Sequence, residues 1–339
     1  MATDIKVDER IIEAQFWADL ARCGITLRQS FTPIMDGKLH RFSTAQDKWG
    51  ETSGAYLIHA DSWPSWFIQD YRQNIKANGK FNAGDLSTGE RAEIFKTVND
   101  PEEQQRRAAE KAKEEERQRE KQQAAMITAH EEYKKYTDQR FTEHSYAVLK
   151  HLTHGNKMLN CLARIRSNGD LLIPLYSADS VIKSPHNSFK WQFQSLQTIS
   201  AKINEKTGKH DKRFFPDAPT KGACLPLIYE QNLEKIGIAE GAATAASLYY
   251  FFNYEIPIFA AMNCGNLINV AKAIRGNAPN SEITIYADND RGKNKNQPEK
   301  NIGYEEALKV LEAGYADKVK QPELSGMDYN DLLITKGLI

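Results

Sequence analysis

The C-terminal part of this sequence, from Glu234 onward, alternates short apolar runs with longer amphipathic or alanine-rich segments. Short apolar runs are typical of buried strands, and the intervening segments are long enough to form helices. We predict strands at 235–239, 256–261, 282–287 and 317–321, separated by helices at 242–252, 267–275 and 303–313. Because a strand–helix–strand alternation joins parallel neighbours, this part of the chain is predicted to form a parallel β-sheet with helices on its faces.

A highly charged segment precedes this region. Residues Pro101–Gln123 contain no Leu, Ile, Val or aromatic residue, so a helix here has no apolar face to bury. Acid-before-base pairs four residues apart, such as Glu115 and Arg119, stabilise a solvated helix. We interpret residues 101–137 as a charged helical linker, and the alternative is a dedicated protein-binding helix.

Strand signals dominate the rest of the chain. An amphipathic helix is predicted at Asp8–Cys23, followed by the alternating runs GKLHRFS, GAYLIHA and WPSWFIQDY, which indicate an antiparallel sheet. Further strands and turns are predicted at 169–177, 189–196 and 212–215. We therefore expect an N-terminal α+β domain at 1–100, a small mixed α/β module at 138–228 and an α/β domain at 229–339.

Composition narrows the class of protein. The chain has 45 Lys and Arg against 45 Asp and Glu, and it lacks any run of about 18 apolar residues, the length that spans a membrane. Its N-terminus has no apolar signal core, so we expect a cytoplasmic protein with no membrane partner. The four cysteines lie far apart without a C-x-x-C pair, which excludes a zinc ribbon. A net charge of zero argues against a nucleic-acid partner unless the charges are unevenly distributed.

Acidic residues follow two of the predicted parallel strands. Glu240 comes after the first strand and precedes Gly241, which allows a tight turn, and Asp288 and Asp290 follow the third strand. Ligands bind at the carboxyl ends of strands in such sheets, so the three carboxylates are expected at one edge. Clustered carboxylates favour a cation, and their oxygens suit Mg²⁺ or Mn²⁺. The alternative is that the two aspartates cap the helix near Gly303 or lie solvated on the loop.

The glutamate after one strand and the Asp-x-Asp after a later strand resemble the signature of the Toprim domain, which primases, topoisomerases, recombination-mediator proteins and some nucleases share. The segment SGMDYNDLL at Ser325–Leu333 is similar to the element that closes Toprim domains in phage and plasmid primases. The resemblance implies that Asp328 and Asp331 join the metal-binding acids. Alternatively, Asp328 caps a helix at Asn330–Thr335.

Other segments extend this resemblance to most of the chain outside the linker. The runs LLIPLYSAD, WQFQSL and KRFF resemble the core that precedes Toprim in zinc-less primases of mobile elements, and the GKLHRFS region resembles their leading domain. The resemblance implies an α/β fold with a Toprim-like parallel sheet flanked by helices. It also implies chemistry that depends on Mg²⁺ and needs no zinc.

The activity that the resemblance implies is that of a DNA primase, a nucleotidyltransferase that joins NTPs into short primers on single-stranded DNA. Glu240, Asp288 and Asp290 would be its catalytic residues. Phosphate groups would be bound near Gly241 and by four basic residues, Arg291, Lys293, Lys212 and Arg213. The alternative for these four is ordinary surface charge.

The N-terminal segment interleaves aromatic and basic residues. On a sheet, aromatic side chains can stack single-stranded bases while neighbouring cations contact the phosphates. The candidate DNA-binding residues are Lys38, Arg41, Lys48, Trp49, Trp66 and Arg72. The alternative is that most of these aromatic side chains belong to the core.

Two other functions remain compatible with the same acids. One is a Toprim nuclease, and the other is a non-catalytic DNA-binding protein of replication or defence, against which the intact acids argue. The sequence has no G-x-x-x-x-G-K-[ST] loop, so we expect no fused helicase motor. A separate replicative helicase is therefore an expected partner.

Overall fold

The computed structural model describes residues 8–60, 63–73, 75–82, 84, 101–137, 140–152, 157–229, 232–293 and 297–339. The chain divides into two compact units, Met1–Glu115 and Glu116–Ile339, and each is described by itself. Among the described residues, no helix combines the length and the apolar character needed to cross a bilayer.

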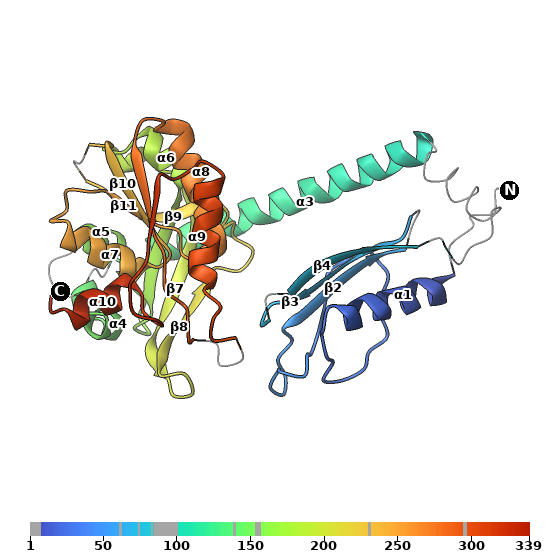
Figure 1. The fold of residues 1–339 in the computed structure, drawn as a ribbon. Coiled ribbons are helices and arrows are strands. Elements are labelled where there is room, and N and C mark those ends of the chain that lie inside the picture. Colours follow the sequence, from blue (N-terminus) through green and yellow to red (C-terminus); the bar gives the residue numbers. More distant parts are fainter. Residues whose placement is uncertain are drawn as a thin grey trace. The chain divides into compact units, whose positions relative to one another are not determined.

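In the first unit, helix α1 packs on one face of a four-stranded antiparallel sheet (Figure 1). Helix α1 (Glu9–Arg22) begins at Asp8, whose side chain accepts a hydrogen bond from the backbone N–H of Arg10. The strands follow one another in space as in sequence: β1 (His40–Phe42), β2 (Gly54–His59), β3 (Ser65–Asp70) and β4 (Ile75–Lys80). The helix and the first three strands confirm the sequence-based expectation.

Strand β4 was not predicted. Its sequence, IKANGK, has no aromatic residue and only one β-branched residue, Ile75, and Gly79 lies inside it. A Cβ atom at Gly79 would lie 1.8 Å from Nε1 of Trp66 on β3. Glycine at this position therefore makes room for the indole ring. Because glycine is rare in strands, it also hides the strand from sequence analysis.

The charged linker is helical. Helix α3 runs over Pro101–Lys134 and so occupies most of the segment 101–137 that was predicted to be a helical linker. Its last turns carry apolar residues, and buried Ala129 and Tyr133 pack against Leu172 and Leu196 of the second unit. The apolar positions that the charged segment lacks thus appear where the helix meets a sheet.

One extended sheet runs through the second unit in the order β13-β12-β10-β11-β9-β6-β7-β8, with β5 paired to β6. Strands β10 to β13 are parallel to their neighbours within this group, as predicted. The other strands are antiparallel. In chain order the strands are β5 (Arg164–Ile165), β6 (Leu171–Ser177), β7 (Phe193–Asn204), β8 (Lys209–Phe214), β9 (Ala223–Leu227), β10 (Lys235–Ala239), β11 (Ile258–Ala260), β12 (Glu282–Tyr286) and β13 (Lys318–Lys320).

Strand β9 makes the sheet continuous across the position, between residues 228 and 229, at which a domain boundary was predicted. It pairs with β11 through Leu225–Leu227 and with β6 through Ala223 and Cys224. Sequence reasoning missed β9 because Pro226 interrupts it, and proline is rare inside a sheet. The mixed module and the parallel region therefore share one sheet.

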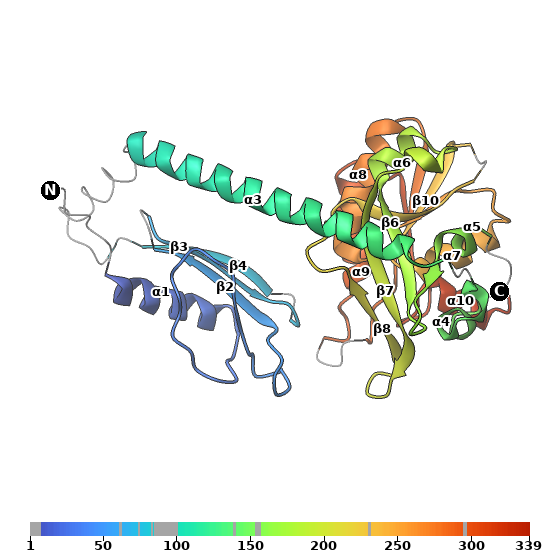
Figure 2. The ribbon, with the colours of Figure 1, turned by 180° about the vertical axis from the view of Figure 1, so that it is seen from behind.

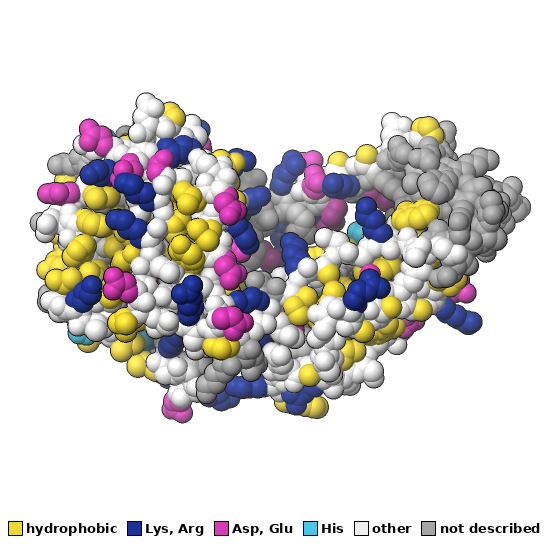
Figure 3. Space-filling model, viewed as in Figure 1, with side chains coloured by type: hydrophobic (Ala, Val, Ile, Leu, Met, Phe, Trp, Pro, Cys, Tyr) yellow, Lys and Arg dark blue, Asp and Glu magenta, His cyan; other side chains and the backbone are white. Residues whose placement is uncertain are grey.

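Helices cover both faces of this sheet (Figures 1 and 2). One face carries α4 (Ser145–Leu149), α5 (Lys157–Leu162), α7 (Ala242–Phe251) and α10 (Tyr329–Thr335). The other carries the end of α3 together with α6 (Ala178–Lys183), α8 (Leu267–Asn277) and α9 (Ile302–Glu312). On the visible surface of this unit, acidic and basic side chains are interspersed (Figure 3).

Candidate active site

Glu240 and Asp288 lie near each other because β10 and β12 are parallel neighbours that end at the same level. Ala239, the last residue of β10, pairs with Tyr286, the last residue of β12. Glu240 follows directly and leads into helix α7, whose N-cap is Gly241. The structure thus places both acids at the carboxyl ends of the strands, where ligands bind in α/β sheets.

Asp290 is held by the helix that follows it. Its Oδ2 accepts a hydrogen bond of 2.9 Å from the backbone N–H of Gly303, in the first turn of α9. Its Oδ1 accepts one of 2.8 Å from Nζ of Lys293. A Cβ atom on Gly303 would lie 3.1 Å from Asp290 Oδ2 and 3.2 Å from the carbonyl oxygen of Asp288. Asp290 therefore contacts the start of the helix, as the alternative interpretation of these aspartates expected.

Between the two aspartates, buried Asn289 fixes the loop. Its backbone N–H donates to the carbonyl of Met327 at 2.9 Å, and its side-chain amide donates to the carbonyl of Pro322 at 2.9 Å. The backbone N–H of Gly326 donates in turn to the carbonyl of Asn289 at 2.8 Å. These bonds hold the segment that ends at Asp328 against the Asp-x-Asp loop.

In the absence of a cation, the ionised forms of Glu240 and Asp288 are destabilised. Burial raises the pKa of Glu240 and of Asp288, and nearby Asp328 raises both further. Lys293 acts in the opposite direction on each. One oxygen of each side chain, Glu240 Oε2 and Asp288 Oδ1, is buried without a hydrogen-bond partner. Because buried carboxylate oxygens are costly to leave unpaired, these two atoms point to a bound cation.

Asp328 and Asp331 form a capping box at the start of α10, which confirms the helix-capping interpretation of Asp328. The backbone N–H of Asp331 donates to Asp328 Oδ1 at 2.9 Å. Lys150 Nζ lies 3.0 Å from Asp331 Oδ1 and 3.8 Å from Asp328 Oδ2. Asp328 is close enough to perturb Glu240 and Asp288, whereas Asp331 is engaged by the lysine.

The residues present fit a hard divalent cation. Within the described part of the chain, no three His, Cys, Asp or Glu side chains are gathered as a ready-made metal centre. Mg²⁺, however, is usually held by one or two carboxylates together with water and substrate phosphate. Glu240 Oε2 and Asp288 Oδ1 supply such a pair of free oxygens.

The predicted phosphate-binding residues are dispersed. Lys293 lies among the acids, and the exposed Arg291 lies on the same loop. Lys212 and Arg213 lie on β8, the edge strand of the sheet, and four strands separate β8 from β10. Lys212 Nζ donates to the hydroxyl group of Tyr146 on α4 at 3.2 Å. The structure therefore does not bring Lys212 and Arg213 beside the carboxylates.

Most of the predicted DNA-binding residues lie on the surface of the first unit. Lys38, Arg41, Lys48, Trp49 and Arg72 are exposed, and the side chain of Trp49 is 88% exposed.

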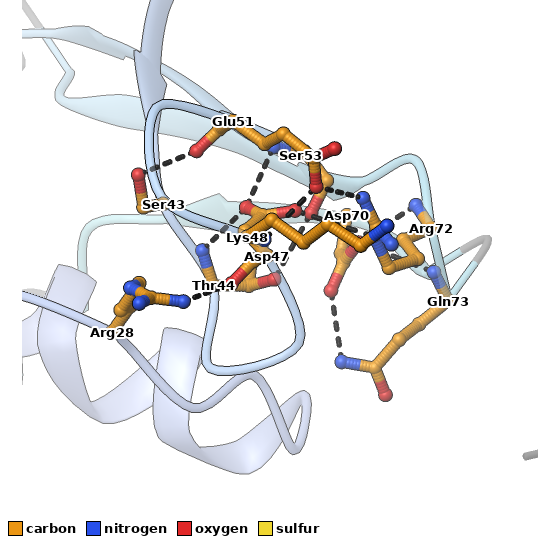
Figure 4. Close-up of polar contacts among 10 residues, drawn as sticks. All are labelled: Arg28, Ser43, Thr44, Asp47, Lys48, Glu51, Ser53, Asp70, Arg72 and Gln73. Carbon is orange, nitrogen blue, oxygen red and sulfur yellow. Dashed lines mark hydrogen bonds and ion pairs between the residues drawn. The ribbon is translucent and has the colours of Figure 1, made fainter. Parts of the chain in front are cut away.

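Arg72 is already ion-paired, with Nη2 at 2.8 Å from Glu51 Oε2 and Nε at 3.3 Å from buried Asp47 Oδ1 (Figure 4). Glu51 Oε2 also accepts a hydrogen bond from the backbone N–H of Lys48. Arg72 therefore ties two strand connections together, and a phosphate would have to compete with Glu51.

Trp66 is a correction to the predicted set. Its side chain is 3% exposed and packs in the core against α1, and its Nε1 donates to Asp19 Oδ2 at 3.0 Å. A base cannot stack on this ring in the folded protein. The alternation of β3 points Trp66 toward the helix, so the alternative interpretation, that these aromatic residues form the core, holds for this one.

With this geometry established, comparison with known families identifies the C-terminal region. The family described as the Toprim domain matches residues 235–338. Residues 235–338 are a Toprim domain. The match spans the strands and loops that carry Glu240, Asp288, Asp290 and Asp328.

The similarity extends beyond the Toprim domain. Two proteins of Escherichia coli, both called DNA primase TraC, are 27% and 26% identical to this chain over 271 and 260 residues. Each alignment covers 76% of this chain but only 22% and 16% of the respective relative. The predicted resemblance to Toprim-domain primases is thereby confirmed, and this chain spans less than a quarter of the length of these relatives.

Solved primase structures are also similar, at a low level. The DnaG primase catalytic domain bound to ssDNA is 9% identical and covers 65% of this chain and 78% of its own, with a TM-score of 0.39. The RNA polymerase domain of Mycobacterium tuberculosis primase DnaG is 12% identical and covers 63% and 79%, with a TM-score of 0.36. Both scores lie below 0.5, and we draw nothing further from them.

Two residues near the Toprim acids were not anticipated. Lys150 contacts Asp328 and Asp331, although it precedes Asp331 by 181 residues in the sequence. Asn330 is fully buried and donates both to the carbonyl of Lys150 at 2.7 Å and to the hydroxyl group of Ser247 on α7 at 2.8 Å. Asn330 lies in the segment SGMDYNDLL that the sequence singled out, but no local signal marks Lys150 or shows which residues these two contact, because their partners come from distant segments that only the fold brings together.

Proposed function

We propose that this chain is a DNA primase-like nucleotidyltransferase that makes short primers on single-stranded DNA. The observation that carries the proposal is the pair of buried, unpartnered carboxylate oxygens, Glu240 Oε2 and Asp288 Oδ1, at the strand ends of the Toprim domain. The similarity to the TraC primases supports it, since that similarity covers far more of the chain than the Toprim domain alone.

In this proposal, Glu240 and Asp288 hold Mg²⁺ or Mn²⁺ with their free oxygens. When bound, the cation would supply Lewis-acid stabilisation of the phosphate charge and would lower the pKa of an attacking hydroxyl group. The reaction is attack by a 3′-hydroxyl oxygen on the α-phosphorus of an NTP, with pyrophosphate as the leaving group. In this proposal, Glu240 either shares the cation or accepts the proton that the hydroxyl group releases.

The remaining residues of the cluster hold the Asp288 loop in place and neutralise the charge of the triphosphate. Asp290, fixed by Gly303 and Lys293, keeps the loop that carries Asp288 against α9. Lys293 and Arg291 lie on the same loop and would neutralise triphosphate charge. Lys150 keeps Asp328 and Asp331 at the border of the site.

The test is synthesis on a template. The full chain is incubated with labelled NTPs, Mg²⁺ or Mn²⁺ and single-stranded DNA, beside Asp288→Ala/Asp290→Ala and a matched control, Glu312→Gln, whose exposed carboxylate lies on α9. We expect template-dependent oligonucleotides from the wild type and the control, and none from the double variant.

Other products would contradict the proposal. Shortened DNA with no new oligonucleotide would assign the same acids to a nuclease. Template binding that yields neither product would indicate a non-catalytic DNA-binding protein. A separate replicative helicase remains the expected partner, and retention of that helicase at low salt in a pull-down is the corresponding measurement.

A further inference from the structure

The sheet of the first unit has one face that α1 does not cover. Tyr56, Ile58, Trp66 and Ile68 point to the helix side and form the core of this unit. Strand pairing places the residues that alternate with them in three rows across the opposite face: Arg41–Ala55–Gln69–Lys76, Leu57–Phe67–Asn78 and His59–Ser65–Lys80. We call this surface the open face.

Solvent reaches most of the open face. Arg41, Lys76 and Lys80 are exposed, and Phe67 is half-buried near the centre, with Leu57 and Asn78 as its neighbours across the sheet. Phe67 lies in the middle of this face, and its ring does not belong to the core of the unit. Part of the ring is therefore accessible to a ligand. This is the arrangement found in sheets that stack unpaired bases.

Cations accompany the aromatic rings on this face. Lys76 Nζ lies 5.5 Å from the centre of the Phe67 ring. The guanidinium carbon of Arg41 lies 4.3 Å from the centre of the Tyr71 ring, and Tyr71 is 49% exposed. Phe67 and Tyr71 are four residues apart on and just beyond β3, while Lys76 and Lys80 are four apart on the adjacent β4. A line of rings therefore runs beside a line of positive charges.

The charge of the open face departs from the balance of the whole chain. Its strand residues include Arg41, Lys76 and Lys80 but neither Asp nor Glu, whereas the entire sequence has a net charge of zero. An acidic peptide would satisfy the cations but would leave the rings without a planar partner. A nucleic-acid duplex would satisfy the cations, but its bases are stacked on each other and hidden from the rings.

We propose that the open face binds single-stranded DNA. Bases stack on Phe67 and Tyr71, and phosphates contact Arg41, Lys76 and Lys80. This proposal adds Lys76 and Lys80, which the sequence analysis did not single out, and it leaves out Trp66. The proposal concerns binding in the first unit, so it is tested without primer synthesis and fails or holds independently of that activity.

The experiment measures binding to the full chain by fluorescence anisotropy, in EDTA, with a labelled oligothymidine of roughly 20 nucleotides, longer than the site size of most stacking platforms. Phe67→Leu keeps an apolar side chain, although a smaller one, and removes the ring. Lys76→Gln/Lys80→Gln removes two charges from the open face. The matched control, Arg10→Gln/Arg22→Gln, removes two exposed charges from α1, on the opposite side of the sheet.

We expect Phe67→Leu to weaken binding by roughly fivefold to a hundredfold with an unchanged salt dependence, since stacking is not ionic. The double lysine variant should weaken binding and reduce the slope of log K against log salt by about 1.4, or about 0.7 for each lost phosphate contact. The control should bind within about twofold of the wild type. Thermal unfolding of each variant checks that the first unit remains folded.

Localisation is tested by photo-crosslinking an oligonucleotide that carries 5-iododeoxyuridine. Crosslinks in the peptides that contain Phe67 or Tyr71 are expected. Crosslinks confined to α1 or to the second unit, or unchanged binding of Phe67→Leu, would overturn the proposal. Equal affinity for a duplex, or tighter binding of oligouridine than of oligothymidine, would overturn the assignment to single-stranded DNA.

Discussion

Replacing Asp288 with asparagine should stabilise the metal-free protein at neutral and mildly alkaline pH. Burial and the neighbouring carboxylates raise the pKa of Asp288 from 3.8 to about 8. Each unit of pKa corresponds to about 1.4 kcal/mol, so ionising this group in the folded protein costs at most about 6 kcal/mol. Asp288 shares that cost with Glu240, and the surroundings relax, so we expect removal of its charge to recover about 2 kcal/mol.

The sign of the pH dependence follows from the direction of the shift. A carboxyl group whose pKa is raised by folding contributes its stability below its ordinary pKa and loses it as the pH rises through the raised value. The melting temperatures of Asp288→Asn and wild type should therefore nearly coincide at about pH 4 and separate by about 4–8 °C at about pH 8. The assay is thermal unfolding in EDTA across this range, with Glu312→Gln as the control.

Metal should reverse the order of stability. At concentrations of Mg²⁺ or Mn²⁺ about a hundredfold above the dissociation constant, the wild type should gain about 2.7 kcal/mol at pH 8, and Asp288→Asn should gain little. If the variant is no more stable than the wild type in EDTA at pH 8, Asp288 is not held ionised at a cost and the reasoning is wrong. Equal stabilisation of both proteins by metal would show that Asp288 is not a ligand.

Three further substitutions test other parts of the structure. Lys150→Met should lower the free energy of unfolding by about 1–3 kcal/mol in urea denaturation, because Asp331 and Asp328 lose a partly buried counter-charge; an unchanged midpoint would contradict this. Gly303→Ala should lower primer synthesis by roughly tenfold although alanine favours helices, because its methyl group presses on Asp290; full activity would refute the close-approach argument. Trp66→Phe should cost about 1–2 kcal/mol in unfolding while single-stranded DNA affinity stays constant, and weaker binding would return Trp66 to the DNA-binding set.

Much of the fold of the Toprim region could be predicted because each of its elements carries a strong local pattern. The strand predicted at Lys235–Ala239 agrees with β10 at both ends, since its apolar run is bounded by charge on one side and Gly241 on the other. Strands β4 and β9 could not be predicted because Gly79 and Pro226 suppress the strand signal. Both segments form strands because they pair with neighbouring strands of the sheet, and a local sequence pattern does not show that pairing.

Some residues of the candidate site could also be predicted from the sequence, and others could not. Glu240 and Asp288 were predictable because a strand-end acid in a parallel sheet has a defined position. For Asp290 the sequence left both metal binding and capping of the helix near Gly303 open, since its contact with Gly303 depends on how closely α9 approaches the loop. Lys150 was beyond local reasoning because its pairing with Asp331 links residues 181 positions apart.

Lys293 offsets part of the negative charge of the acid cluster. If this is its main role, replacing it should strengthen metal binding, whereas if it mainly orients Asp290, replacing it should weaken metal binding. Its Nζ lies 2.8 Å from Asp290 Oδ1, and it lowers the pKa of both Glu240 and Asp288. It therefore supplies part of the positive charge that a bound cation would supply, and it repels that cation. Lys293→Met should tighten Mn²⁺ binding by roughly threefold to tenfold, the effect expected for loss of one charge at a partly screened distance of several ångströms.

Isothermal titration of Mn²⁺ measures this directly, with Lys309→Met as the control, because Lys309 lies on α9 and is ion-paired to Glu306. If Lys293 also neutralises triphosphate, the KM for NTP should rise while the metal affinity increases, so the two effects separate. Weaker Mn²⁺ binding by Lys293→Met would mean that its main effect is to orient Asp290 for the metal. The electrostatic account of the acid cluster would then be wrong, because the lysine would be helping the cation to bind.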